Sequence, residues 1–101
     1  MHMKKRLEII IEKPALKRAG RVLKDAGVKG YTVFPAMAGY GDNMQWQRGT
    51  DLSASRDMVM IISILDDTVV TKAIDDLENL MGAHIAVLSI SDVQVLRPEK
   101  F

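Results

Sequence analysis

Residues Gly30–Gly41 read GYTVFPAMAGYG, a segment that begins as a β-strand and ends in a Gly-x-Gly turn. Its β-branched and aromatic residues favour the strand, and a proline lies near the strand's end. Glycines let backbone amides approach an anion such as a phosphate, although a simple tight turn explains the same pattern. We therefore interpret Gly39, Tyr40 and Gly41 as a candidate anion-binding turn.

The sequence before this segment alternates like a strand and then repeats like a helix. Every second residue between Lys4 and Glu12 faces one side, as in a half-buried strand. Pro14 suits the first turn of the helix that follows, and Gly27 suits its end. The apolar stripe of this helix consists of Leu16, Ala19, Val22, Leu23 and Ala26. The basic residues on its other sides are better explained as a solvated face than as a partner surface.

The sequence after this segment is polar at first and then becomes apolar. We expect a loop over Ala38–Asp57, a length that is usually functional or disordered. Met58–Leu65 reads as an apolar strand, and Asp66 or Asp67 caps a second helix. Ala83–Ile90 reads as another apolar strand, and Val93–Leu96 as a short extended tail.

The order is therefore β-α-β, long loop, β-α-β. It predicts one α+β domain over residues 1–101, with the ferredoxin-like βαββαβ arrangement: an antiparallel sheet with both helices on one face. The strands are apolar on both faces, since Ile61 and Ile62 point to opposite sides and either could face outward. The uncovered face requires a partner, and we expect a homotrimer in which three sheets close around an axis.

The composition disfavours several classes of protein. A net charge of +1 over 101 residues is too small for a nucleic-acid binder held mainly by phosphate contacts. The chain has no cysteine and no long apolar run, so we expect a cytoplasmic protein without membrane insertion. His2 and His84 lack metal-ligand spacing, which favours a hydrogen-bonded structural role for His84 and no metal site. Ser53 and Ser55 have no nearby histidine base, so we expect no catalytic residues.

Two further residues are candidates for contacts. Arg97 follows the last extended segment, and an arginine can grip phosphate with two parallel hydrogen bonds. In an oligomer, one subunit's tail could meet the Gly39–Gly41 turn of another subunit. Trp46 is a large ring in a polar loop, so it either folds back on the body or docks onto another molecule.

Three segments resemble the PII signalling proteins: Lys5–Ile11 (KRLEIII), Leu23–Val33 (LKDAGVKGYTV) and Gly39–Gly41. The resemblance covers nearly the whole chain and places Ala38–Asp57 at the family's T-loop. It implies a ferredoxin-like homotrimer that binds adenine nucleotides in the clefts between subunits. It also implies signalling to partner proteins through the T-loop.

The chain departs from typical PII proteins in two loops. Met81–His84 (MGAH) stands where the family has its Thr-Gly-x-x-Gly-Asp-Gly-Lys phosphate loop, and Met44–Gly49 (MQWQRG) replaces the uridylylated Glu-Leu-Tyr-Arg-Gly segment. These departures resemble the PII-like branch linked to inorganic carbon, namely carboxysome-associated PII proteins and regulators of bicarbonate transporters. Members of that branch look like sensors of ADP or AMP, in some cases together with bicarbonate.

At matched positions the resemblance implies roles for individual residues. Thr32 would hydrogen-bond near the nucleotide, and Arg97 would meet phosphate from a neighbouring subunit. Leu7 and Ile64 would line the adenine pocket. The implied nucleotide-binding set is Leu7, Thr32, Gly39, Tyr40, Gly41, Ile64 and Arg97, and weaker candidates for an anion or partner contact are Trp46, Arg48 and Arg56.

The leading hypothesis is a non-enzymatic regulator whose T-loop becomes ordered when ADP or AMP binds, and which signals to an unidentified protein in inorganic-carbon metabolism. A nitrogen-regulatory PII protein is one alternative. A trimeric metal-binding protein of the copper-tolerance type is another, against which the missing cysteines count. A small ferredoxin-like enzyme would need a general base in a pocket, and no residue is a convincing candidate. Binding tests with ADP, AMP, ATP and bicarbonate would separate these hypotheses.

Overall fold

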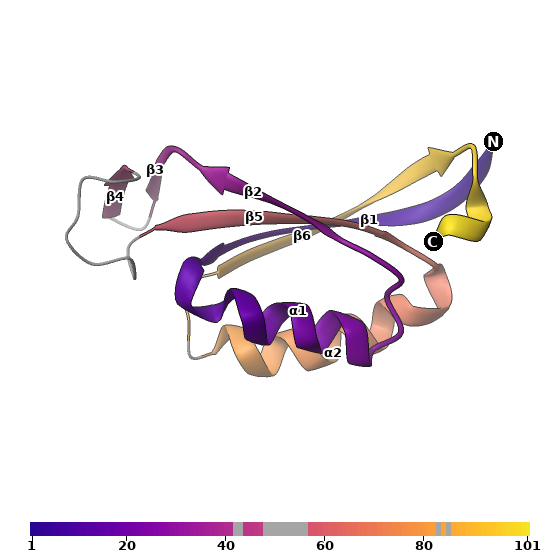
Figure 1. The fold of residues 1–101 in the computed structure, drawn as a ribbon, viewed down its shortest axis with the longest axis horizontal. Coiled ribbons are helices and arrows are strands. Elements are labelled where there is room, and N and C mark those ends of the chain that lie inside the picture. Colours follow the sequence, from indigo (N-terminus) through magenta and orange to yellow (C-terminus); the bar gives the residue numbers. More distant parts are fainter. Residues whose placement is uncertain (42–43, 48–56, 83, 85) are drawn as a thin grey trace.

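The computed structural model describes residues 1–41, 44–47, 57–82, 84 and 86–101. Its main elements are β1 (His2–Glu12), α1 (Leu16–Asp25), β2 (Thr32–Ala36), β5 (Met58–Leu65), α2 (Asp67–Met81) and β6 (Ala86–Val95). The four strands form one antiparallel sheet in the order β2–β5–β1–β6, and both helices cover the same face (Figure 1). The expected ferredoxin-like fold is therefore confirmed.

The core lies between the sheet and the helices. Leu7, Ile9 and Ile11 alternate along β1 and are at most 1% exposed, as the period-two pattern predicted. Ile61 and Leu65 of β5 continue this buried layer in the neighbouring strand. The remaining buried apolar residues of the cluster, most of them on the helices, are Ala15, Ala19, Leu23, Ala26, Val28, Val59, Ala73, Leu77 and Leu80.

The first helix begins and ends as its sequence indicates. A short 3₁₀ turn, η1 (Lys13–Ala15), contains Pro14 and leads into α1. Gly27 follows the helix with a φ of 98°, in the region that favours glycine. The turn it makes sends the chain back towards the sheet, so that Val28 is buried.

We expect Gly27→Ala to lower the free energy of unfolding by about 1–2 kcal/mol, because a Cβ is strained at positive φ. Chemical denaturation followed by circular dichroism would measure the change. Gly82→Ala is the matched control, since Gly82 has a φ of −62° and the atom nearest to an added Cβ would be 3.9 Å away. The prediction is wrong if both substitutions change stability equally.

The second helix is capped by Asp66, one of the two aspartates proposed for this role. Its carboxylate accepts hydrogen bonds from Lys4 Nζ at 3.1 Å and from the Thr68 backbone amide at 3.4 Å. Both contacts favour the charged form, with Lys4 the larger cause, and hold the pKa of Asp66 below its ordinary value. This stabilising contribution is lost as the pH falls through that lowered pKa. Among the described helices, none is long and apolar enough to span a membrane.

The segment after β2 differs from the loop expected over Ala38–Asp57. Ala38–Gly41 (β3) pairs antiparallel with Met44–Gln47 (β4), so the proposed Gly39–Gly41 turn is part of a strand in a two-stranded sheet. The signal for β4 was present, because Met44–Gln47 (MQWQ) alternates apolar and polar residues as a strand does. The polar composition of the whole segment obscured this local pattern.

The last strand also differs from the expected one, because β6 runs without interruption over Ala86–Val95. The polar residues that suggested a break pair with the beginning of β1: Ser91 lies opposite Arg6, and Asp92 lies opposite Lys5. Lys5 and Asp92 form an ion pair across the two strands. The hydrogen bond with Asp92 is the largest cause that raises the pKa of Lys5 above its ordinary value.

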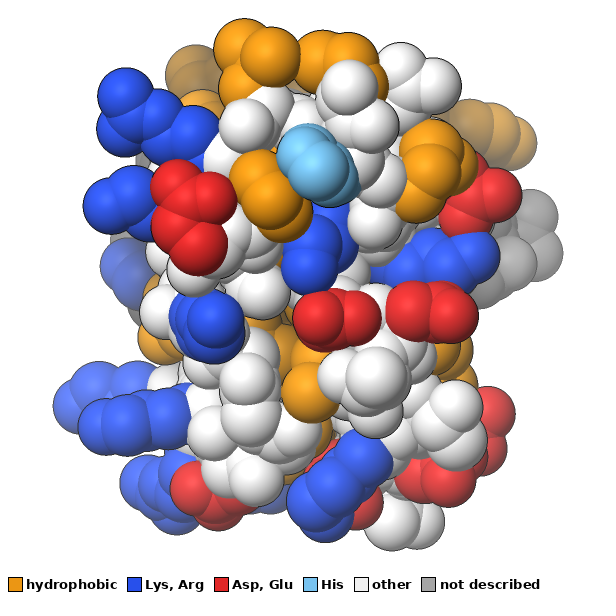
Figure 2. All heavy atoms as spheres, turned by 90° about the vertical axis from the view of Figure 1, so that its right-hand side faces the viewer, with side chains coloured by type: hydrophobic (Ala, Val, Ile, Leu, Met, Phe, Trp, Pro, Cys, Tyr) orange, Lys and Arg blue, Asp and Glu red, His pale blue; other side chains and the backbone are white. Residues whose placement is uncertain are grey.

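The face of the sheet opposite the helices carries an apolar row across all four strands. Phe34, Met60, Ile10 and Val87 follow one another in register through β2, β5, β1 and β6. Phe34 is 46% exposed and Val87 is 65% exposed. Hydrophobic side chains also lie along the edge of the molecule opposite the helices in Figure 2. Ile61 is buried beneath the helices, so Ile62 is the residue that faces outward.

Candidate functional site

A pocket of about 330 Å³ opens at the beginning of β2 and includes two of the residues expected to bind a ligand, Thr32 and Ile64. A volume in this range suits part of a small-molecule ligand. The residues that line it come from β2, β5 and the chain's last residues: Gly30, Tyr31, Thr32, Ile62, Ser63, Ile64, Lys100 and Phe101.

The pairing of β2 with β5 positions the walls of this pocket. Thr32 lies opposite Ile62, which places the first residue of β2 beside the central part of β5. Ser63 is 2% exposed, and its hydroxyl donates a hydrogen bond to the Gly30 carbonyl at 2.7 Å. Because this hydrogen bond fixes the chain just before β2, the backbone at Gly30 is held in place at the pocket.

The last residues of the chain form the remaining wall, which the sequence reasoning did not identify. Pro98–Lys100 form a 3₁₀ turn, η3, that brings Lys100 and Phe101 to the pocket. The Lys29 ammonium donates to the Glu99 carbonyl at 3.4 Å and joins this turn to the segment before β2. Lys100 adds a positive charge, and Phe101 adds an aromatic surface. The available signal in the sequence was Lys100 followed by Phe101, a cation next to an aromatic residue. No local pattern linked these residues to Thr32.

Leu7 and Ile64 lie on opposite faces of the sheet. Leu7 is 1% exposed within the helix-covered core, and its partner across the strands is Ser63. Ile64 is paired with Arg6 and is partly exposed on the other face, at the pocket. The structure therefore does not bring Leu7 and Ile64 together, and within one protomer Leu7 is inaccessible to a ligand in this pocket.

The Gly39–Gly41 segment lies at the other end of the molecule from the pocket. Figure 1 shows strands β3 and β4 at one end of the sheet and both chain termini at the other. Gly39 and Gly41 are paired with Trp46 and Met44, while the Tyr40 side chain is 75% exposed. A site that contains both Thr32 and this segment therefore requires residues from two protomers.

Arg97 lies at the same end as the pocket but does not line it. It precedes η3, its side chain is exposed, and its carbonyl accepts a hydrogen bond from the Lys100 amide at 3.1 Å. Arg48 and Arg56 lie outside the described residues. For Trp46 only the backbone position in β4 is described.

His84 has the structural role expected from the sequence. Its Nδ1 is 2.8 Å from a Glu12 carboxylate oxygen, and its Nε2 is 3.4 Å from an Arg18 guanidinium nitrogen. The histidine thus bridges the end of β1 and α1. In the part of the chain that the structure describes, no three His, Asp or Glu side chains gather into a group that could hold a metal ion.

Almost the whole chain matches one known family, since residues 4–100 match Nitrogen regulatory protein P-II. The chain belongs to the P-II family. This P-II protein is 29% identical over 84 residues to a UPF0166 protein of Aquifex aeolicus (strain VF5), a match that covers 83% of this chain and 78% of the relative.

Solved structures confirm that this P-II protein resembles the PII-like branch. CPII, a nitrogen regulatory PII-like protein from Thiomonas intermedia K12, has been solved bound to ADP, AMP and bicarbonate. The two chains are 31% identical with a TM-score of 0.90, over 99% of this chain and 94% of CPII. A signaling protein from Thermus thermophilus shares the fold with a TM-score of 0.83 at 23% identity, over 100% of this chain and 99% of that one.

Proposed function

We propose that this P-II protein is a non-enzymatic, cytoplasmic regulator that binds ADP or AMP in the clefts between the subunits of a homotrimer. The main support is the pocket beside β2, where Thr32 and the Gly30–Tyr31 backbone offer polar groups next to the apolar Ile64. An adenine ring needs this combination of apolar contact and a few fixed hydrogen-bonding groups. CPII, which is similar along nearly its whole length, binds ADP and AMP.

The charges near the pocket favour a ligand with phosphate groups. Lys100 lines the pocket, and Arg97 is exposed at the same end of the protomer. The Gly39–Gly41 segment at the other end offers a second set of groups. Packing the end of one protomer against the opposite end of the next would combine both sets, as the family resemblance implies.

The uncovered face of the sheet supports the trimer. The row formed by Phe34, Met60, Ile10 and Val87 places apolar side chains on all four strands of this face. Apolar surface of this kind is more stable when buried against another copy. Three sheets packed around an axis would cover the row in every subunit.

Bicarbonate is the second ligand we propose, with the T-loop as the element that reports binding to a partner in inorganic-carbon metabolism. CPII has also been solved bound to ADP and bicarbonate, and bound to ADP, AMP and acetate. Arg48, Arg56 and Trp46 are the residues of the loop that we propose for the anion or the partner. Regulation of nitrogen metabolism is the second candidate, favoured by the family to which the chain belongs.

Calorimetry with ADP, AMP and ATP, each with and without bicarbonate, tests the proposal. We expect ADP or AMP to bind with one site per subunit, and bicarbonate to change the measured affinity. A protein that binds none of the three nucleotides would contradict the proposed function. A strong response to 2-oxoglutarate together with ATP would favour the nitrogen-regulatory alternative.

We expect Lys100→Gln to weaken ADP binding by about tenfold, because hydrogen bonds to charged groups contribute about 1.5–3 kcal/mol. Calorimetry would measure the change. Lys72→Gln is the matched control, since it removes the same charge from an exposed position on α2 that pairs with Asp76. An equal loss in both variants would indicate an effect of net charge and contradict a contact at Lys100.

A further inference from the structure

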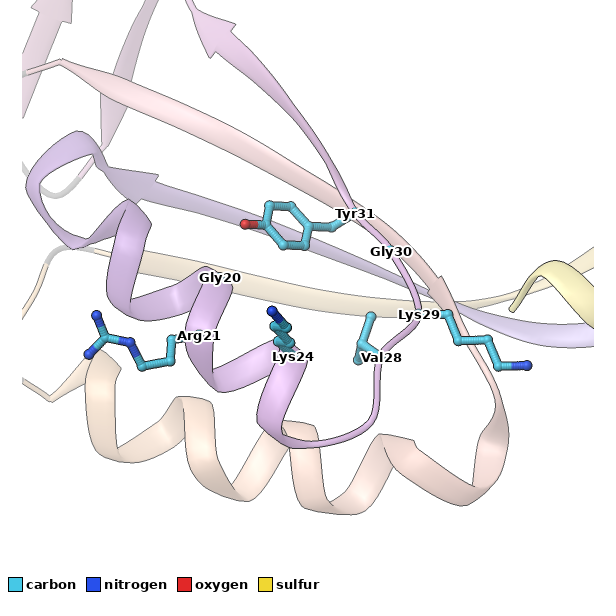
Figure 3. A pocket seen from close by; sticks show the side chains of 7 residues that line it. All are labelled: Gly20, Arg21, Lys24, Val28, Lys29, Gly30 and Tyr31. Carbon is cyan, nitrogen blue, oxygen red and sulfur yellow. The ribbon is translucent and has the colours of Figure 1, made fainter.

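A second and larger hollow lies on the other side of the Gly30–Tyr31 segment. It has a volume of about 600 Å³ and opens between the end of α1 and the segment that leads into β2 (Figure 3). It is separate from the pocket that contains Thr32 and Ile64, although both include Gly30 and Tyr31. Its full lining is Gly20, Arg21, Lys24, Val28, Lys29, Gly30 and Tyr31.

The hollow is positively charged. Three of its lining residues are Arg21, Lys24 and Lys29, and none is acidic. None of the three forms an ion pair with a carboxylate among the residues that the structure describes, and Lys29 donates only to the Glu99 carbonyl. Lys24 points upward from α1 towards the level of the Tyr31 ring, while the Arg21 and Lys29 side chains extend to either side, away from Lys24 (Figure 3).

The Tyr31 ring forms an aromatic wall because residue 20 is a glycine. A Cβ at Gly20 would overlap the Tyr31 hydroxyl oxygen, so the ring could not keep its position. The ring therefore extends over α1 instead of turning away from it (Figure 3). Tyr31 is 45% exposed, so part of its surface is available to a ligand.

We propose that this hollow, formed by Arg21, Lys24, Lys29 and Tyr31, binds a small organic anion with two or more negative charges. The arginine can hold a phosphate or a carboxylate with two hydrogen bonds, while the lysines act as point charges. The organic part of the ligand packs against the Tyr31 ring and Val28. The volume lies within the range of small-molecule sites. This proposal does not depend on nucleotide binding in the neighbouring pocket.

The helix dipole of α1 opposes the binding of an anion in this hollow. The carbonyl end of α1 carries a partial charge equivalent to roughly −0.5. Three full positive charges from side chains at the hollow outweigh that half charge. The balance also predicts that affinity falls as salt increases, because the site is open to solvent.

Titration of the ¹⁵N-labelled protein with pyrophosphate, and separately with citrate, tests the site. Ionic strength is held constant with sodium chloride. We expect saturable amide shifts concentrated at residues 20–31, and the tighter of the two probes identifies phosphate or carboxylate as the preferred group. The absence of saturable shifts there with both probes would overturn the proposal.

Charge variants test which residues hold the anion. We expect Lys24→Gln and Arg21→Gln each to weaken binding by about tenfold. Lys24→Arg keeps the positive charge, so we expect it to bind the anion as the wild type does. Lys17→Gln removes the same charge from an exposed position of the same helix that does not line this hollow. An equal loss in Lys17→Gln would show a general effect of helix charge and overturn the site.

Gly20→Ala tests the aromatic wall. Alanine favours a helix more than glycine does, so the variant should remain folded while its methyl group displaces the Tyr31 ring. We expect several-fold weaker binding of citrate or pyrophosphate, with unchanged circular dichroism. Unchanged affinity would contradict the role assigned to Tyr31.

Discussion

Met60→Lys is expected to leave the protein monomeric at micromolar concentration. Met60 is at the centre of the apolar row, between Phe34 on β2 and Ile10 on β1, so neither of its direct cross-strand partners offers a carboxylate to the new ammonium group. Burying an unpaired charge is strongly unfavourable. Each 1.4 kcal/mol of this cost lowers the association constant of the subunits about tenfold. We therefore expect a nearly complete loss of assembly. Sedimentation velocity would measure it.

Ile62→Lys is a weaker test of the same surface, because Glu8 lies directly opposite Ile62 and could pair with the lysine. Thr71→Lys is the control, since it adds the same charge at an exposed position of α2. Monomeric Met60→Lys should also lose nucleotide binding if the site spans two subunits. A Met60→Lys variant that assembles like the wild type would refute the proposed interface.

Arg97→Ala is expected to weaken ADP binding by about ten- to a hundredfold while leaving the fold and assembly intact. Arg97 is exposed, so its removal should have little effect on stability. A charge-assisted contact with phosphate contributes about 1.5–3 kcal/mol, which gives this range. Calorimetry with ADP measures the change, and AMP measured in parallel shows whether the contact involves the second phosphate.

Arg18→Ala is a suitable control for Arg97→Ala. It also removes an exposed guanidinium, but one whose described contact is with His84. Unchanged ADP affinity in a folded, assembled Arg97→Ala variant would mean that the phosphates are held by other residues, with Lys100 the first to consider.

The features that the sequence predicted well depend on local patterns. Alternation identified Leu7, Ile9 and Ile11 as a buried set, and the glycine after α1 was placed correctly at Gly27. Each of these follows from steric or periodic rules that act within a few residues. The order of such elements is compatible with few topologies, which is why the ferredoxin-like fold could be predicted.

The features that were missed depend on contacts between distant residues. The Lys5–Asp92 pair, which accompanies the continuation of β6, joins positions 87 residues apart. Lys100 and Phe101 reach the Thr32 pocket only because η3 folds back on β2. Alternation placed Leu7 and Ile9 on one face, but only the strand register shows that Ile64 is on the opposite one. A single sequence does not contain that register.

The Gly30–Tyr31 segment has a thermodynamic consequence because it is a wall of two hollows at once. An anion that shifts the Tyr31 ring also shifts the backbone that leads into Thr32. The Ser63–Gly30 hydrogen bond holds this backbone on its other side, at Gly30. The binding free energies of the two ligands are then linked. This linkage is reciprocal: if the anion changes the affinity for the nucleotide by some factor, the nucleotide changes the affinity for the anion by the same factor. One protomer would thereby compare the concentrations of two metabolites.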